Sequence, residues 1–332
     1  MTRESQFPQA LQLFISLSDL QISVIPAICE PKVLLSELSS KDKPWDKHRA
    51  MADKVEEYYA NSELSKYGNR ISICSTLLDF KLVPNIELGE LFLKLSSAHF
   101  CRCRHCPVCQ WRRSLMWKAK FHQILPKILE DYPTYRWIRL TLTIRSPEIT
   151  DLRSTIDHLN KSFKLMTKRK AFPGVGWIKS LEVTKNGTST AHPHFHILMM
   201  VKPSYFSGNS YLKKLDWIEL WKSCLKVNYD PDVDIRVVKV TDDLLKCLPE
   251  MVKYQVKESD LVDDRDWFLE MNKQLYKTRA IEVGGILKPY LRALEQEPEN
   301  LIGQGDDDEI DEGHLFFAWQ QVKKHYKKVG EG

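Results

Sequence analysis

Two histidines, His194 and His196, are separated by one residue at the start of an apolar segment. Side chains alternate between the two faces of a β-strand, so residues two apart point the same way. Both imidazoles would share one face, with Phe195 and Ile197 turned toward an apolar core on the other. This arrangement suits a metal site on a sheet, although an isolated pair is more often a set of hydrogen-bonded surface groups. Other parts of the chain have to decide between the two interpretations.

A carboxylate from the preceding segment can complete this pair. Residues 177–184 predict a strand, and Lys-Asn-Gly at 185–187 predicts a hairpin turn. Glu182 would then lie on the neighbouring strand, beside the two imidazoles. Two nitrogens and one carboxylate form a half-open site that leaves positions for water or phosphate oxygens. A solvent-facing strand residue is the alternative for Glu182.

Four of the eight cysteines fall within residues 101–109. In a cytoplasmic protein this density favours metal binding over disulfides. Cys106 and Cys109 form a C-x-x-C pair that fits a tetrahedral Zn²⁺, with Cys101 as a third candidate. Cys103, which is near but cramped, and the distant Cys74 are alternatives for the fourth ligand. Reduced buried thiols and an iron–sulfur cluster are alternative interpretations.

Residues 101–120 contain six basic side chains and no acidic one. From Trp111 to about Glu130 the pattern predicts a helix that carries basic and aromatic residues. Such a face suits contact with nucleic-acid phosphates, and a solvated helix face is the ordinary alternative. The candidate phosphate-contacting side chains are Arg102, Arg104, Arg112, Arg113 and Lys118.

The clearest predicted strand covers residues 136–144, where apolar residues alternate with Arg139, Thr141 and Thr143. One face of this strand is apolar. The other face carries small hydroxyl groups, as expected of a strand beneath a bound substrate. Thr141 and Thr143 are therefore further candidates for contact with DNA.

Residues 242–256 predict a helix, because apolar residues recur at three- and four-residue spacing. Glu250, Tyr254 and Lys257 follow one another by four and three residues, so all three can project from one helical face. Together they offer a base, a nucleophile and a cation. An exposed, charge-decorated helix is the ordinary alternative.

The composition is that of an ordinary globular protein, with 332 residues, 43% hydrophobic and 28% charged, and a formal net charge of +5. This mild basic excess permits a nucleic-acid partner. No apolar run approaches the roughly 18–20 residues of a membrane span. The first residues lack the layout of a signal peptide, so we expect a cytoplasmic protein without membrane contact.

Charge and pattern divide the chain into four parts, and a run of Asp and Glu at 306–312 marks the third. Within the main part, residues 70–82 predict a short strand, and helical spacing of apolar residues predicts helices at about 42–65, 149–170 and 211–227 and from Gly285 to Leu294. The four parts are an N-terminal extension (1–41), a main region (42–300) with a zinc element at about 74–115, an acidic linker (301–313) and a C-terminal helix (314–332).

Taken together and in order, four motifs resemble the replication initiators of rolling-circle plasmids in the HUH endonuclease superfamily, specifically the group with a single tyrosine. The match covers about residues 42–295. The resemblance implies an α+β fold in which a central antiparallel sheet has flanking helices on one side, related to the ferredoxin-like arrangement. It also favours Cys74 as the fourth zinc ligand. The motifs are the cysteine motif 101–109 with Trp111, Arg112 and Arg113, the strand segment 140–143, the histidine segment 192–196, and Tyr254 with Lys257.

The resemblance implies an enzyme that nicks one strand at a plasmid origin by metal-assisted transesterification. Tyr254 would form a 5′-phosphotyrosine link and leave a 3′-OH primer. Mg²⁺ or Mn²⁺, held by the two histidines and Glu182, would polarise the scissile phosphate. Lys257 would stabilise the phenolate or position phosphate. Glu250 would activate water, so that replication ends by hydrolysis or strand transfer.

The implied partners are origin DNA in double- and single-stranded form, a host helicase and a DNA polymerase, with a structural Zn²⁺ in the cysteine element. The oligomeric state is left open, with a dimer among the options.

Three other functions fit part of the pattern. They are a zinc-containing DNA-binding regulator without nuclease activity, a mobilisation relaxase, in which the tyrosine usually stands near the N-terminus, and a metal hydrolase acting on small phosphoesters. Covalent DNA capture by Tyr254 would separate the nuclease from the regulator and the hydrolase.

Overall fold

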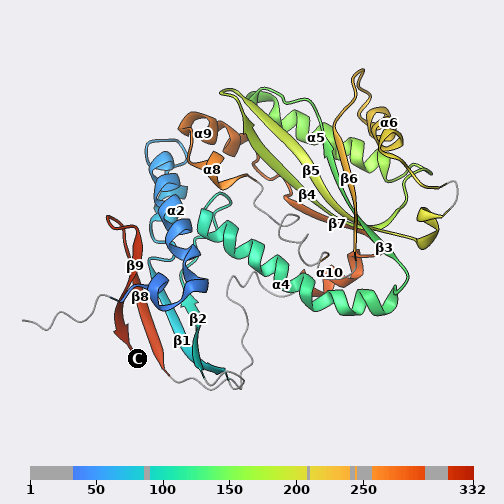
Figure 1. The fold of residues 1–332 in the computed structure, drawn as a ribbon. Coiled ribbons are helices and arrows are strands. Elements are labelled where there is room, and N and C mark those ends of the chain that lie inside the picture. The colour runs from blue at the N-terminus through green and yellow to red at the C-terminus, as the bar shows by residue number, and fades with distance from the viewer. Residues whose placement is uncertain (1–32, 86–89, 208–209, 240–243, 245–255, 296–312) are drawn as a thin grey trace, which may run out of the picture.

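The structure, a computed structural model (Figure 1), describes residues 33–85, 90–207, 210–239, 244, 256–295 and 313–332. It shows an α+β fold with two antiparallel sheets, one of five strands in the order β6-β3-β5-β4-β7 and one of four in the order β2-β1-β8-β9. Figure 1 shows the two sheets toward opposite ends of the molecule, with the long helix α4 (Pro107–Asp131) running from beside the smaller sheet to the larger one. No helix among the described residues is both long and apolar enough to cross a membrane.

The larger sheet is built around β5, which pairs antiparallel with β3 on one side and β4 on the other. The edge strands β6 and β7 extend the sheet beyond β3 and β4. This arrangement confirms the strands predicted at 136–144 and 177–184, and the hairpin turn after the second, where Gly187 has a φ of +72°. The five strands are β3 (Arg136–Thr143), β4 (Gly174–Asn186), β5 (Thr190–Val201), β6 (Val233–Val238) and β7 (Ile281–Gly285).

Helices cover both faces of the larger sheet, so the prediction of helices on one side is wrong. The helices α5 (Leu152–Met166) and α6 (Lys214–Leu225) lie over the face that carries Phe195, Ile197 and Met199 of β5. On the opposite face, α4 and α10 (Lys288–Glu295) pack over Leu198 and Met200. The sequence indicated both helix pairs but not which face each would cover, because long-range packing alone decides that.

The smaller sheet contains the largest departure from the sequence prediction. Residues 314–332 form a hairpin of two strands, not a helix. The strand β8 pairs with β1, which lies far earlier in the chain, so no local pattern shows its partner. Its aromatic residues suit a pleated surface, and the side chain of Phe317 is fully buried there. The four strands are β1 (Leu77–Asn85), β2 (Glu90–Ala98), β8 (His314–Gln320) and β9 (His325–Glu331).

Helical elements near the N-terminus pack against this sheet. The helix predicted from residue 42 is confirmed as α2 (Pro44–Ala60), and α1 (Leu35–Leu38) contacts β9, where Leu34 bridges Lys327. The strand predicted at 70–82 begins only at Leu77, because α3 (Ser65–Ser72) occupies its first part. Of the predicted acidic linker at 301–313, only Gly313 belongs to the described residues.

The segment after α9 (Arg265–Gln274) forms β7, which the sequence did not indicate. Two glycines of β7 show why this segment can pair closely with β4. A Cβ atom on Gly284 would collide with the indole of Trp177 on β4, and Gly285 has a φ of +59°. Only glycine allows both the close approach and this backbone conformation at no steric cost.

We predict that Tyr326→Phe lowers the free energy of unfolding by about 1–3 kcal/mol, the cost of leaving a buried acceptor unsatisfied. The fully buried Tyr326 hydroxyl donates to the carbonyl oxygen of Ser75 at 2.7 Å, and Ser75 has a φ of +52°. Urea denaturation measures the change. Tyr211→Phe is the control, because its side chain is 49% exposed and its loss should change stability by less than about 0.5 kcal/mol. Equal effects of the two variants would contradict the role of this hydrogen bond.

Candidate metal centres

The register of the larger sheet gathers three ligand-type side chains at one place. Glu182 on β4 lies opposite His194 on β5, and Thr141 on β3 lies opposite His196. The Glu182 Oε2 atom is 2.8 Å from His196 Nε2 and 3.4 Å from His194 Nε2, and the two Nε2 atoms are 3.2 Å apart. The three side chains are 12–20% exposed, so the cluster is sheltered but open to solvent.

These separations fit the ligands of one divalent ion. Ligand atoms about 2.0–2.1 Å from an octahedral ion lie about 3.0 Å apart when they are adjacent. The three measured separations, 2.8–3.4 Å, bracket that value. Two imidazoles and one carboxylate occupy one side of such an ion and leave the other side for water or phosphate oxygens. Glu182, His194 and His196 are thus one of two groups of described residues that could hold a metal ion.

Hydrogen bonds orient both imidazoles toward this position. The Nδ1 atom of His194 lies 3.1 Å from the carbonyl oxygen of His192, which can only accept, so Nδ1 carries the proton in the neutral ring and Nε2 is left as a ligand. The Nδ1 atom of His196 lies 3.3 Å from Thr141 Oγ1. Contacts of this kind fix the ring orientation in metal sites and raise ligand basicity. Thr141 therefore supports His196 from the neighbouring strand.

Glu182 carries the negative charge of the cluster. Burial raises the pKa of its carboxyl group, but hydrogen bonds with His194 and His196 more than offset that effect and hold the pKa below its ordinary value. Glu182 is therefore a carboxylate at neutral pH, the state required of a metal ligand.

Two side chains near the cluster were not singled out from the sequence. His192 shares the face of His194, with ring centroids 5.1 Å apart, and its Nδ1 lies 3.1 Å from Ser146 Oγ. The alternation that identified the pair could also have identified His192, whereas Ser146 comes from a loop and only the fold brings it there.

Thr143, also a candidate for contact with DNA, donates to the carbonyl oxygen of Asp232 at 3.0 Å.

A second group of ligand-type side chains is formed by four buried thiols, those of Cys74, Cys101, Cys106 and Cys109. The Sγ atoms of neighbouring members are 3.6–3.7 Å apart. With Zn–S bonds of about 2.3 Å, the sulfurs of a tetrahedral zinc site lie about 3.8 Å apart. The donor set therefore fits a zinc ion with Cys74 as the fourth ligand.

Three separate parts of the chain bring these thiols together. Cys74 precedes β1, Cys101 follows β2, and Cys106 and Cys109 lie at the start of α4. The backbone N–H groups of Cys101 and Cys103 donate to the sulfurs of Cys74 and Cys101, each at 3.4 Å. The Cys103 thiol instead points to the carbonyl oxygen of Tyr67 at 4.0 Å, outside the cluster.

The basic candidates form several internal contacts around this element. Arg104 donates to the carbonyl and hydroxyl oxygens of Thr278, and Arg113 donates to the carbonyl oxygen of Arg102. Burial lowers the pKa of Arg112 to about 10, and its guanidinium lies over the rings of Trp45 and Trp111. Arg102 and Lys118 are exposed. The basic residues therefore stabilise the element as well as charging its surface.

The candidates Glu250 and Tyr254 lie outside the described residues, as does most of the predicted helix 242–256. Lys257 is described and exposed, and it comes just before α8 (Glu258–Leu261). The preceding residue, Val256, is buried and forms a parallel bridge with Val183, the neighbour of Glu182 on β4.

Comparisons with known proteins define the class. A family model described as "Replication protein" matches residues 92–327. The "Protein rep" of Streptococcus pneumoniae serotype 2 is 32% identical over 317 residues, which cover 91% of this chain and 98% of the relative. The "Protein rep" of Bacillus amyloliquefaciens is 34% identical over 329 residues, covering 87% and 94%. A "Replication protein" of Staphylococcus aureus is 29% identical over 223 residues, covering 61% and 95%. No solved structure matches this chain.

This chain belongs to that family of replication proteins, since the family model spans more than half of it and relatives align over nearly their full length. The resemblance seen in the sequence motifs is thereby confirmed at the level of a replication protein.

We predict that Thr141→Val weakens Mn²⁺ binding by about 10- to 100-fold, because removing a group that orients a ligand has this effect in metal sites. Isothermal titration calorimetry measures the affinity. Thr143→Val is the matched control on the same strand, since its hydroxyl contacts Asp232 and neither histidine. A Thr141 variant that binds Mn²⁺ as the wild type does would show that the hydroxyl does not support the site.

We also predict one zinc ion per chain, measured by atomic emission, and its loss in Cys74→Ser. Cys103→Ser should keep the zinc, because the Cys103 thiol lies outside the four-thiol group. Loss of zinc from Cys103→Ser, together with its retention in Cys74→Ser, would assign the fourth ligand to Cys103.

Proposed function

We propose that this protein initiates rolling-circle replication of a plasmid by nicking one strand of the origin, with Tyr254 as the nucleophile. The observation that carries the proposal is the convergence of Glu182, His194 and His196 on one face of the sheet. The replication-protein family supports the setting, and the metal-ligand geometry supports the chemistry. A regulator without nuclease activity would leave this cluster without a use.

A bridge formed by Val256, two residues after Tyr254 in the sequence, supports this choice of nucleophile. Val256 bridges Val183, and Glu182 is the next residue of β4. Two residues of chain span at most about 7 Å, so the length of chain before Val256 is compatible with Tyr254 acting at this site. Lys185, farther along β4, holds the following segment through its backbone N–H to Asp260 Oδ2 at 2.8 Å and its ammonium to Asp263 at 2.6 Å.

The proposed reaction exchanges one phosphodiester for another. The Tyr254 phenolate oxygen attacks phosphorus, the bond from phosphorus to the 3′ oxygen breaks, and that oxygen takes up a proton to become the 3′-OH primer. The phosphate stays on Tyr254, so the energy of the bond is kept for later strand transfer. A free phenol has a pKa of about 10, so attack at neutral pH needs a cation near the phenol. Lys257 is the candidate on this chain.

The histidine cluster would hold Mg²⁺ or Mn²⁺, which when bound polarises the scissile phosphate and offsets charge on its oxygens. Glu182 supplies the negative charge that attracts the cation, and the two imidazoles supply the nitrogen ligands. Glu250 would act as a general base on water to hydrolyse the phosphotyrosine link at termination. The four-thiol group would hold a structural Zn²⁺. The proposed partners are origin DNA, a host helicase and a DNA polymerase.

We predict that wild-type protein forms a covalent adduct with labelled single-stranded origin DNA in Mn²⁺, and that Tyr254→Phe forms none. Denaturing gels detect the adduct. Glu182→Gln should reduce adduct formation at least about 100-fold while leaving the tyrosine in place, because it removes a ligand rather than a group that orients one.

Tyr211→Phe is the matched control, since Tyr211 is 49% exposed and belongs neither to the histidine cluster nor to the segment around Tyr254. An adduct that persists in Tyr254→Phe but disappears in Tyr276→Phe would move the nucleophile to Tyr276. Tight binding with no adduct in any divalent metal would favour the non-nuclease regulator.

A further inference from the structure

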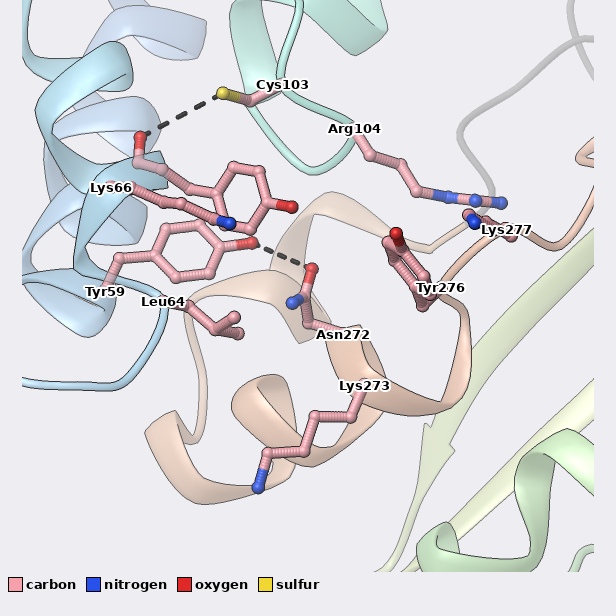
Figure 2. A pocket seen from close by; sticks show the side chains of 10 residues that line it. Tyr59, Leu64, Lys66, Cys103, Arg104, Asn272, Lys273, Tyr276 and Lys277 are labelled. Atoms are coloured by element: carbon pink, nitrogen blue, oxygen red, sulfur yellow. Dashed lines mark hydrogen bonds between the residues drawn. The ribbon is translucent and has the colours of Figure 1, made fainter.

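A cavity of about 630 Å³ opens beside the zinc element, and Cys103 and Arg104 belong to its lining (Figure 2). Its walls come from the end of α2 and the start of α3, from the loop that carries Cys103 and Arg104, and from the segment Asn272–Lys277 at the end of α9. The volume lies within the roughly 300–1,000 Å³ typical of small-ligand pockets. None of the contacts described for the histidine cluster involves it.

The charged side chains that line the cavity are all cationic. Four cationic side chains line it, those of Lys66, Arg104, Lys273 and Lys277, and no described acidic residue does. Lys273 forms an ion pair with Glu270 at 3.8 Å, and Figure 2 shows it directed away from the other side chains. Within the described part of the chain, Lys66 and Lys277 have no such carboxylate partner. These two ammonium groups are therefore available to an anion.

Three tyrosine rings also line the cavity. Tyr59 and Tyr67 lie on one wall with ring centroids 5.7 Å apart, and Figure 2 shows Tyr276 on the other side of Asn272. The ammonium groups of Lys66 and Lys277 lie 5.4 Å and 5.2 Å from the Tyr67 and Tyr276 ring centroids. Two of the cationic side chains thus each lie close to an aromatic ring of the cavity.

Two arginine side chains hold the wall that carries Tyr276 in place. Arg153 donates to the carbonyl oxygen of Tyr276 at 2.5 Å, and Arg104 donates to that of Thr278 at 2.5 Å. Between them Lys277 has a φ of +57°, an uncommon conformation for a residue other than glycine. This turn brings two consecutive side chains, Tyr276 and Lys277, to the same cavity. Preorganisation of this kind reduces the entropy cost of binding.

Asn272 adds a polar group at the centre. The Tyr59 hydroxyl donates to Asn272 Oδ1 at 3.0 Å, and burial raises the pKa of Tyr59, so it stays protonated as a donor. The amide nitrogen Nδ2 of Asn272 remains to donate to a ligand carbonyl.

We infer that this cavity binds one unpaired nucleotide of single-stranded DNA, with its base against the tyrosine rings and its phosphate at Lys66 and Lys277. Unpaired bases stack on aromatic side chains whatever their identity, and cations follow the backbone. Duplex DNA could bind a basic surface through its phosphates. Its paired bases are stacked inside the helix, however, so they could not contact the tyrosine rings of the cavity. The inference rests on the proposed function only for the choice of DNA as the single strand.

Fluorescence anisotropy on the full chain tests the inference. The background is Tyr254→Phe with no added divalent cation, so binding is measured without cleavage. The probes are an oligothymidylate, an abasic strand of equal length and a blunt duplex. Tyr276→Ala should weaken oligothymidylate binding by about 5- to 150-fold, the effect of losing one stacked base, and Tyr276→Phe should restore it. The abasic strand and the duplex should change little with Tyr276→Ala.

Charge is tested separately. Lys66→Gln with Lys277→Gln should weaken the binding of both single strands. The slope of log affinity against log salt should fall by about 0.7 for each phosphate that the protein no longer neutralises. The matched controls are Lys164→Gln on α5 and Tyr211→Ala, both exposed and outside the cavity, and neither should change binding. Because Lys66, Tyr276 and Lys277 are themselves exposed, their variants should fold.

Equal losses of affinity for all three probes in Tyr276→Ala would overturn the inference in favour of a general phosphate contact. Unchanged affinity for every probe would overturn it in favour of another ligand. The nuclease proposal is tested independently by the Tyr254-dependent adduct. Absence of that adduct with base-dependent binding in the cavity would reject the nuclease while upholding the nucleotide site.

Discussion

The register of β5 between β3 and β4 is the constraint on which the proposed chemistry depends. It places Glu182 opposite His194 and Thr141 opposite His196. One backbone alignment therefore positions the three candidate metal ligands and the threonine that supports His196. A slip of one residue would turn the imidazoles into the core and Phe195 out to solvent. The alignment is held because Phe195 and its apolar neighbours on β5 are fully buried beneath α5 and α6, while α4 and α10 cover the far half of the other face.

The four-thiol group has a comparable role at the other end of the molecule. It joins the end of β2, the approach to β1 and the first turn of α4, three segments that local structure alone would leave separate. The same loop carries Arg104, which holds the turn at Thr278 and so one wall of the nucleotide cavity. Zinc at this position would therefore stabilise both the junction between the sheets and the shape of a surface for single-stranded DNA.

Local patterns predicted most of the individual elements. The strand at 136–144, the hairpin of β4 and β5, and the helices α2 and α4 follow from alternation, turn residues and helical spacing. The failures have a common cause. The strands β7 and β8 obtain their stability from partners far away in the chain, and neither Gly284 nor Phe317 shows its neighbour locally. The helix predicted at 314–332 failed because pairing with β1 outweighed a weak helical pattern. Helices on both faces of the sheet were likewise a matter of packing.

By itself the sequence determined the chemical inventory: the imidazole pair, the neighbouring carboxylate, the cysteine cluster and the basic segment, together with the strand alternation that puts His194 and His196 on one face. Tertiary structure decided what sequence spacing left open. It selected Cys74 over Cys103 for the thiol group, because three chain segments meet there. It committed Arg104 to Thr278, and it joined Tyr59 and Tyr276 in one cavity although they lie far apart in the sequence. Local periodicity fixes which face a side chain occupies, but only long-range packing fixes which side chains share that face.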